Sequence, residues 1–160
     1  MRLAIEHPAR VGRLVLMGPV GVRFDLTPGL DEAWGYTPSI ESMRRLLDVF
    51  AVDRSLVTDD LARMRHAASL RTQAAFSAMF PAPRQRWIEA LASSEDEIAG
   101  IEHKTLVVHG REDHVIPLSN SLRLLELISA SQLHVFGQSG HWVQIEQAAA
   151  FNRLVNDFLS

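Results

Sequence analysis

An aspartate and a histidine each follow a short apolar run, and this arrangement constrains the fold more than any other feature. Asp113 comes soon after the run 105–109, and His141 comes soon after the run 132–136. A helical pattern over 117–128 lies between the two runs, so the order is strand, crossover helix, strand, which is typical of a parallel sheet. The carboxyl ends of parallel strands meet at one edge, where functional residues gather. The sequence therefore predicts that Asp113 and His141 lie close together.

An acid and a base in this chain order are the last two members of a Ser, Asp, His triad. No Gly-x-Ser-x-Gly occurs in the chain, and Ser139 has the wrong spacing for a nucleophile elbow and stands two residues before the histidine. No nucleophile is therefore assigned. The segment 1–8 has the pattern of a helix end stopped by Pro8, and 13–18 that of the next buried strand. We interpret the chain as the downstream half of a larger fold.

Several segments taken together resemble one enzyme family. They are His7–Gly18, Trp34–Pro38, Asp53–Thr58, Met79–Trp87, His109–Asp113 and Leu133–Gly137. In these segments the chain resembles the C-terminal part of an α/β-hydrolase of the meta-cleavage-product hydrolase group, which cleaves carbon-carbon bonds in aromatic degradation. The Trp34–Pro38 and Met79–Trp87 segments are most similar to the 2-hydroxymuconate semialdehyde hydrolase branch.

The resemblance implies an α/β fold in which parallel strands 6 to 8 and their flanking helices carry a helical cap. It divides the chain into a core remnant over 1–23, a helical cap over 24–93, and the C-terminal part of the core over 94–160. The local patterns agree with a helix-rich middle. Ser39 is placed to cap one amphipathic helix and Thr58 a second, while Ser94 begins a Ser-x-x-Glu capping box.

The helix that follows Thr58 carries the cap residue of most interest. Leu61, Met64 and Ala68 are predicted as its apolar stripe, with Arg65 one position away from that stripe. An arginine there is ordinarily a solvated surface charge. The resemblance instead implies that Arg65 binds the dienoate carboxylate of the substrate, for which a guanidinium fork supplies two parallel donors.

The resemblance also assigns roles to the other site residues. It makes His141 the general base, Asp113 the acid that orients its imidazole, and Trp142 a surface for the substrate's diene. From pattern alone, Asp113 is equally explained as a turn residue that bonds backbone amides, and Trp142 as core filling. Glu112 and His114 are expected to be solvated turn residues.

The remaining histidines are expected to be structural, and they have no convincing metal-ligand spacing. They include His7, His103, His109 and His134. The sequence therefore predicts no metal site, and the family chemistry implies no organic cofactor.

Composition excludes several classes of partner. The net charge of −3 gives no reason to expect nucleic acid or an acidic membrane surface, and no apolar run approaches a membrane span. With no cysteine there is no disulfide framework and no thiolate metal site. The start has no signal-peptide pattern, so a cytoplasmic location is expected. The expected partner is a small ring-fission product, a vinylogous keto acid.

Three functional interpretations stay open. The favoured one is a truncated hydrolase for 2-hydroxy-6-oxohexa-2,4-dienoate-type ring-fission products, inactive alone because the nucleophile is missing. The second is a non-enzymatic module that binds small carboxylates, and the third is a half-enzyme completed by a separate N-terminal chain. In each case the strand at 14–17 is expected at an exposed sheet edge, through which the chain could form a homo-oligomer.

Overall fold

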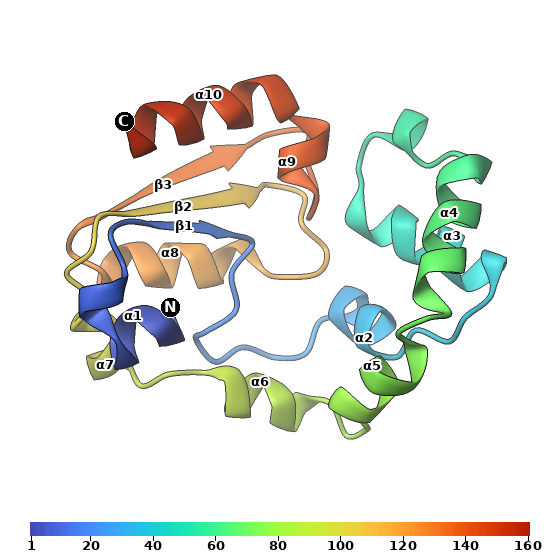
Figure 1. Ribbon diagram of the computed structural model, residues 1–160, viewed down its shortest axis with the longest axis horizontal. Coiled ribbons are helices and arrows are strands. Elements are labelled where there is room, and N and C mark those ends of the chain that lie inside the picture. Colours follow the sequence, from blue (N-terminus) through green and yellow to red (C-terminus); the bar gives the residue numbers. More distant parts are fainter.

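The computed structural model describes residues 1–160 and contains one three-stranded parallel sheet (Figure 1). The strands are β1 (Leu14–Met17), β2 (Thr105–Gly110) and β3 (Ser131–Phe136), in the order β1-β2-β3. The register pairs Thr105 with Leu14 on one side and with Ser131 on the other. All three predicted strands and their parallel arrangement are confirmed.

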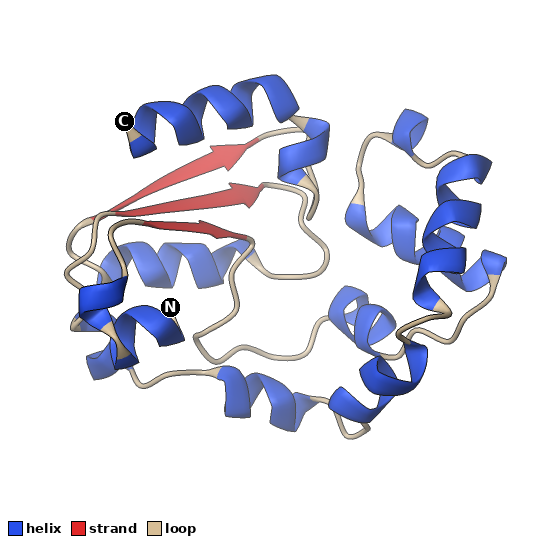
Figure 2. Ribbon diagram, viewed as in Figure 1, coloured by secondary structure: helices blue, strands red, loops and turns tan.

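Helices cover both faces of the sheet, as Figure 2 shows. Near the sheet lie α1 (Arg2–Glu6), η1 (Pro8–Arg10), α7 (Glu95–Ala99), α8 (Leu118–Leu127), α9 (Val143–Glu146) and α10 (Ala148–Leu159). Val107 packs with Leu124 of α8 in one core cluster, whereas Leu106 and Val108 pack in another cluster, against which α10 lies. Because successive strand residues point to opposite faces, β2 supplies both cores.

The second part of the molecule is helical and contains no strand. It comprises α2 (Pro28–Trp34), α3 (Ile40–Phe50), η2 (Arg54–Leu56), α4 (Asp59–Ser69), α5 (Gln73–Met79) and α6 (Gln85–Leu91). These helices extend from the carboxyl ends of the strands, and α6 leads back to the sheet (Figure 1). All of them fall within the range 24–93 predicted as a cap, although the boundaries themselves stay a prediction.

The predicted helix starts are present. The Ser39 side chain accepts from Ser42 N at 2.9 Å, and that of Thr58 accepts from Leu61 N at 3.1 Å. Ser94 and Glu97 form the reciprocal capping box at the start of α7. Each cap satisfies amide groups that have no partner within the helix.

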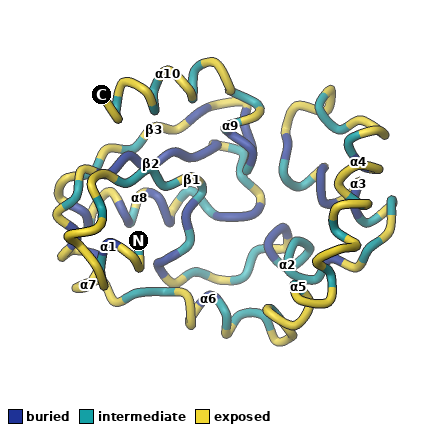
Figure 3. The backbone as a smooth tube through the Cα atoms, viewed as in Figure 1, coloured by how far each residue is buried: buried dark blue, intermediate teal, exposed yellow.

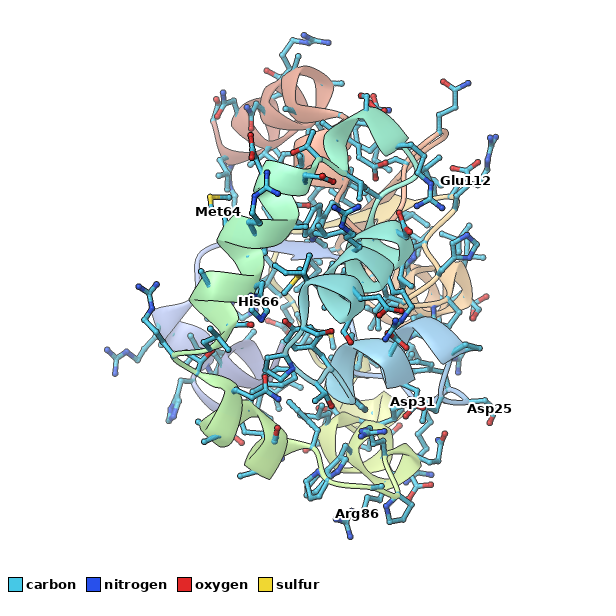
Figure 4. The ribbon with its side chains drawn as sticks, turned by 90° about the vertical axis from the view of Figure 1, so that its right-hand side faces the viewer. Asp25, Asp31, Met64, His66, Arg86 and Glu112 are labelled. Atoms are coloured by element: carbon cyan, nitrogen blue, oxygen red, sulfur yellow. The ribbon has the colours of Figure 1, made fainter.

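The predicted apolar stripe of α4 was wrong at Met64 but right at Leu61, which packs against a core cluster. Met64 is 61% exposed, whereas Ala62 is fully buried in the cluster that contains Trp142. Figure 4 shows Met64 at the outer margin of α4. Residues three apart share a helix face, so Arg65 lies on the same side as Ala62. The position that pattern analysis treated as off the stripe therefore belongs to the inner face.

The strand β1 forms one edge of the sheet, because it pairs with β2 alone. The amides of Leu14 and Gly18 donate toward the β2 side, to Lys104 O and Val108 O. Since backbone groups alternate between the two sides of a strand, those of Val15 and Met17 point to the unpaired side. The expected exposed edge is present (Figure 3 shows β1 only partly buried).

We predict that α8 stabilises the core cluster that contains Val107 through one leucine. Replacing the fully buried Leu124 by alanine should lower the free energy of unfolding by about 2–5 kcal/mol, because a cavity remains beside β2. The control Leu122→Ala removes a side chain that is 46% exposed on the same helix and should cost less than about 1 kcal/mol. Urea unfolding followed by circular dichroism measures both, and equal losses would contradict this account of the core.

Candidate active site

Asp113 and His141 form a hydrogen-bonded pair at the carboxyl ends of β2 and β3. The Asp113 Oδ2 atom lies 2.9 Å from His141 Nδ1. The other carboxylate oxygen accepts the amides of Val115 and Ile116, at 2.7 and 3.0 Å. The Asp113 side chain is 1% exposed and that of His141 27% exposed. The carboxylate is thus held by its own turn, and the imidazole keeps one side accessible.

The surroundings of Asp113 keep it ionised. Burial raises the pKa of the carboxyl, but the contact with His141 and two backbone amides lower it by more, so the pKa lies below its ordinary value of 3.8. An ionised carboxylate accepts the Nδ1 proton of the imidazole and leaves Nε2 to exchange protons with a substrate. This is the arrangement that an acid and base of a hydrolytic triad require.

The end of β1 presses against the same pair. Gly18 has a φ of +45°, and a Cβ built there would lie 3.1 Å from both Asp113 Oδ2 and His141 Nδ1. A side chain at this position would crowd the Asp113–His141 pair. The positive φ is also a backbone conformation that favours glycine. All three strand ends therefore meet at one place, and Gly18 is a contributor that the sequence analysis did not identify.

A second histidine lies beside the aspartate but is fully buried. His109 Nε2 contacts Ile116 O at 3.0 Å, and its Nδ1 contacts Ser121 Oγ at 2.7 Å. Burial lowers the pKa of His109 below 6.5, so the ring is neutral at neutral pH. The carbonyl can only accept, hence Nε2 carries the proton and Nδ1 accepts from the serine. These bonds agree with the structural role expected for His109.

Glu112 differs from the sequence expectation. Its Oε2 accepts the amide of Ser139 at 3.1 Å, and its side chain is 30% exposed. The bond from the Ser139 backbone, with that from Arg111, holds its pKa below the ordinary value. Glu112 therefore fastens the loop that carries His141, while His114 is exposed as expected. The expectation overlooked a partner that is 27 residues away.

A cleft of about 520 Å³ opens between α3, α4 and the loop after β3. Its lining is mainly apolar and includes Tyr36, Leu47, Phe50, Phe76, Arg65 and Trp142. The Arg65 guanidinium carbon lies 4.8 Å from the centre of the Trp142 ring. No carboxylate pairs with Arg65, whereas its neighbour Arg63 pairs with Asp60. The cleft thus presents an apolar body and two arginines, Arg65 and Arg71, without an ion-pair partner.

Phe50 joins this cleft to the Asp113–His141 pair. Its ring centroid lies 5.5 Å from that of His141 and 5.4 Å from that of Trp142. Its carbonyl accepts the Trp142 amide at 3.2 Å. The structure thus brings Asp113 and His141 into direct contact, and Arg65 and Trp142 into contact in the adjoining cleft.

No group of histidine, aspartate and glutamate side chains has a geometry that could hold a metal ion. No helix is both long and apolar enough to cross a membrane. Aromatic residues pack together in the helical part: Trp34 stacks on Phe80 at 4.7 Å, and Trp87 meets the same ring edge-on at 6.2 Å.

Comparison with known proteins places these features in a family. A family model described as alpha/beta hydrolase fold matches residues 1–148. The chain is 62% identical, over its full length, to a 2-hydroxy-6-oxo-2,4-heptadienoate hydrolase of Pseudomonas putida (strain F1). It is 60% identical to a 2-hydroxymuconate semialdehyde hydrolase of Pseudomonas sp. (strain CF600). It spans 59% and 57% of the lengths of these two relatives.

The fold also matches solved structures. A meta-cleavage product hydrolase of Pseudomonas fluorescens IP01, crystallised with acetates, superposes with a TM-score of 0.97 at 61% identity. The alignment covers 99% of this chain and 59% of that one. The resemblance inferred from the sequence motifs is therefore confirmed at the level of the family.

We predict that Asp113 contributes stability in its ionised form. Because its folded pKa is lowered, this contribution is complete above the unfolded pKa near 3.8 and is lost as pH falls through the folded value. The difference in unfolding free energy between the wild type and Asp113→Asn should therefore shrink between pH 5 and pH 3. Urea titrations across that range test this, and a difference that widens toward pH 3 would contradict it.

Proposed function

The chain belongs to the alpha/beta hydrolase fold family, and from this membership we propose that it supplies the acid, base and substrate-binding cap of a carbon-carbon bond hydrolase. The proposed substrates are 2-hydroxy-6-oxo-2,4-dienoates, the class named for its similar relatives. The observation that carries the proposal is the Asp113–His141 pair beside an apolar cleft that contains two unpaired arginines, of which Arg65 lies over Trp142. Such a cleft suits a conjugated acid with a carboxylate at one end.

The proposed binding mode follows from the chemistry of the cleft. The Arg65 fork engages the two oxygens of the substrate carboxylate, since two parallel donors match a planar carboxylate. Trp142, 7% exposed, offers part of its ring beside the conjugated chain. The 6-oxo end extends toward His141 past Phe50, whose ring lies near both residues. The carboxylate and the reacting carbon are thereby held at opposite ends of one cleft.

The proposed reaction moves protons through His141. The 2-hydroxyl loses a proton and carbon 5 gains one, which gives a 2,6-dioxo intermediate. Water then adds to the carbon of the 6-oxo group, and the bond between carbons 5 and 6 breaks. Its electron pair passes along the conjugated chain to the 2-oxo oxygen, which takes up a proton. The products are a 2-hydroxypentadienoate and a small acid, with His141 as the group that accepts and returns protons.

The proposal places the nucleophile outside these 160 residues. His141 engages only its Nδ1 in a hydrogen bond, so Nε2 remains for a nucleophile. No serine of the chain bonds to it. Ser139 is fully buried, and its hydroxyl bonds to Glu146 at 3.3 Å. We expect no enzyme-like turnover from this chain alone, because removal of a nucleophile alone costs about 10⁶ in comparable triads.

Further parts of the proposal concern the setting of the site. We propose the range 24–93 as the cap, with 1–23 and 94–160 as the core. A cytoplasmic location and self-association through the free edge of β1 also belong to the proposal. A half-enzyme completed by a separate N-terminal chain stays an alternative source of the nucleophile.

A second candidate is a binding module for small carboxylates. It is favoured by the same unpaired Arg65, which needs no nucleophile to bind an anion. The two candidates differ in turnover, not in binding.

We predict that Arg65 supplies most of the affinity for the carboxylate. Arg65→Gln should weaken binding of 2-hydroxy-6-oxo-2,4-heptadienoate about ten- to a hundredfold, because a charged hydrogen bond contributes roughly 1.5–3 kcal/mol. Isothermal calorimetry measures this. Arg63→Gln is the matched control on the same helix, since Arg63 pairs with Asp60 away from the cleft, and it should leave affinity within twofold. Equal effects of the two substitutions would refute the binding mode.

We predict that turnover requires the polypeptide encoded upstream. The visible absorbance of 2-hydroxymuconate semialdehyde should persist with the 160-residue chain and decay with a product extended into the preceding codons. In the extended product, His141→Ala should lower turnover by at least about a thousandfold. If the short chain turns over at enzyme-like rates, another residue attacks and the proposed mechanism fails. Binding without turnover in both products supports the binding module.

A further inference from the structure

One carboxylate, that of Glu146, joins two segments that no other side chain joins in this way. Its Oε1 accepts the amides of Val52 and Asp53 at 2.6 and 2.8 Å. Its Oε2 accepts the amide of Gly140 at 2.7 Å and the hydroxyl of Ser139 at 3.3 Å. The first two donors follow α3 in the helical part, and the last two belong to the loop that leads to His141.

We propose that Glu146 is a positioning residue that locks the segment after α3 to the loop carrying the base, and so fixes the Arg65 helix relative to His141. This inference rests on the roles proposed for His141 and Arg65. Glu146 touches neither of them. It acts through the backbone on each side, and it lies in α9, which directly follows the loop.

The three backbone amides depend on Glu146 alone. None of the amides of Val52, Asp53 and Gly140 donates to another acceptor. Glu146 also has no cationic partner, so its charge is balanced by these N–H groups and one hydroxyl. An amide hydrogen bond to a charged acceptor is stronger than a neutral one. The bonds of Val52 and Asp53 are exposed and that of Gly140 is partly buried, so an unpaired donor would cost most at Gly140.

A second set of contacts joins the end of α3 to the loop that carries His141, and we call the whole junction the seam. The Trp142 amide donates to Phe50 O at 3.2 Å, which ties the end of α3 to the residue after the base. A Cβ built on Gly140 would lie 2.7 Å from Phe50 O, so the two backbones pass too closely for a side chain there. The carboxylate therefore braces a backbone contact in which the helical part and the base-bearing loop already meet.

A carboxylate suits this position better than the isosteric amide. Each Glu146 oxygen receives two donors, one oxygen for each segment. A glutamine has one oxygen, and its NH₂ group would face donors on one of the two sides. Glu146→Gln therefore keeps the size of the side chain but releases one segment from the other.

The link reaches Arg65 through short stretches of chain. Val52 and Asp53 lie between α3 and α4, and the two helices pack against each other. Arg65 sits on the inner face of α4, with its guanidinium over Trp142 at 4.8 Å. If the segment after α3 moves away from the loop, the distance between Arg65 and the base is no longer fixed.

Hydrogen exchange and proton spectra of the 160-residue chain test the inference without substrate. In Glu146→Gln, amide exchange at Val52, Asp53 or Gly140 should rise about ten- to a hundredfold. The upfield ring-current shift that Trp142 imposes on the Arg65 side chain should shrink, and the Nδ1 proton of His141 should exchange faster with water. The ring-current shift reports the position of the Arg65 side chain relative to Trp142. A general loss of stability would not change that position as long as α4 stays folded.

Glu112→Gln is the matched control. It also removes a carboxylate that holds the amide of Ser139, but it has no bond to the segment after α3. In this variant, the amide exchange rates of Val52 and Asp53 should stay within twofold of the wild type. The ring-current shift of Arg65 should not change. If the Glu146 variant leaves all three amides and the Arg65 shift as in the wild type, or if both variants change them equally, the inference is overturned.

The wild type supplies a measurement that does not depend on a folded variant. Because one carboxylate holds the three amides, Val52, Asp53 and Gly140 should open together, with protection factors that agree within about threefold. Protection factors that differ by a hundredfold would show that the carboxylate does not act as one lock. Loss of ligand affinity is not among these readouts. A failed Arg65 binding test with intact coupling would therefore refute the proposed function and leave the lock in place.

Discussion

The pairing of β2 with a strand on each side fixes the geometry of everything else in the molecule. All six residues of β2 are buried, and its side chains alternate between the two core clusters. With β2 held on both edges, its end delivers Asp113 beside the end of β3, which leads to His141, and beside Gly18 at the end of β1. Asp113 and His141, the proposed acid and base, are therefore positioned by sheet register.

Features with a local cause could be predicted from the sequence. The helix starts at Ser39, Thr58 and Ser94 depend on a side chain that bonds an amide within three residues. The strands follow from apolar runs bounded by turns, and the meeting of Asp113 with His141 follows from parallel strand order. What these share is that one short segment, or one rule of topology, contains the whole physical reason.

Features whose cause lies far along the chain could not be predicted. The apolar stripe of α4 was placed on Met64 because hydrophobic periodicity cannot separate two faces that differ by one position in a helix of low hydrophobicity. The neighbours α3 and Trp142 decide that Ala62 is buried. Glu146 resembles any polar helix residue in sequence, since its amide partners in the helical part lie 93 and 94 residues away.

The seam between the helical part and the base-bearing loop has a chemical consequence. It is closed by backbone atoms and one carboxylate: Phe50 O receives the Trp142 amide, and Glu146 receives amides from both sides. If ion pairs closed the seam, they would engage the arginines of α4. The seam contains no such ion pair, so Arg65 has no acceptor within the chain and its guanidinium contacts the Trp142 ring. An unpaired guanidinium at an apolar cleft keeps its donors available for a ligand, and we propose that the way this seam is closed leaves Arg65 free to bind a carboxylate.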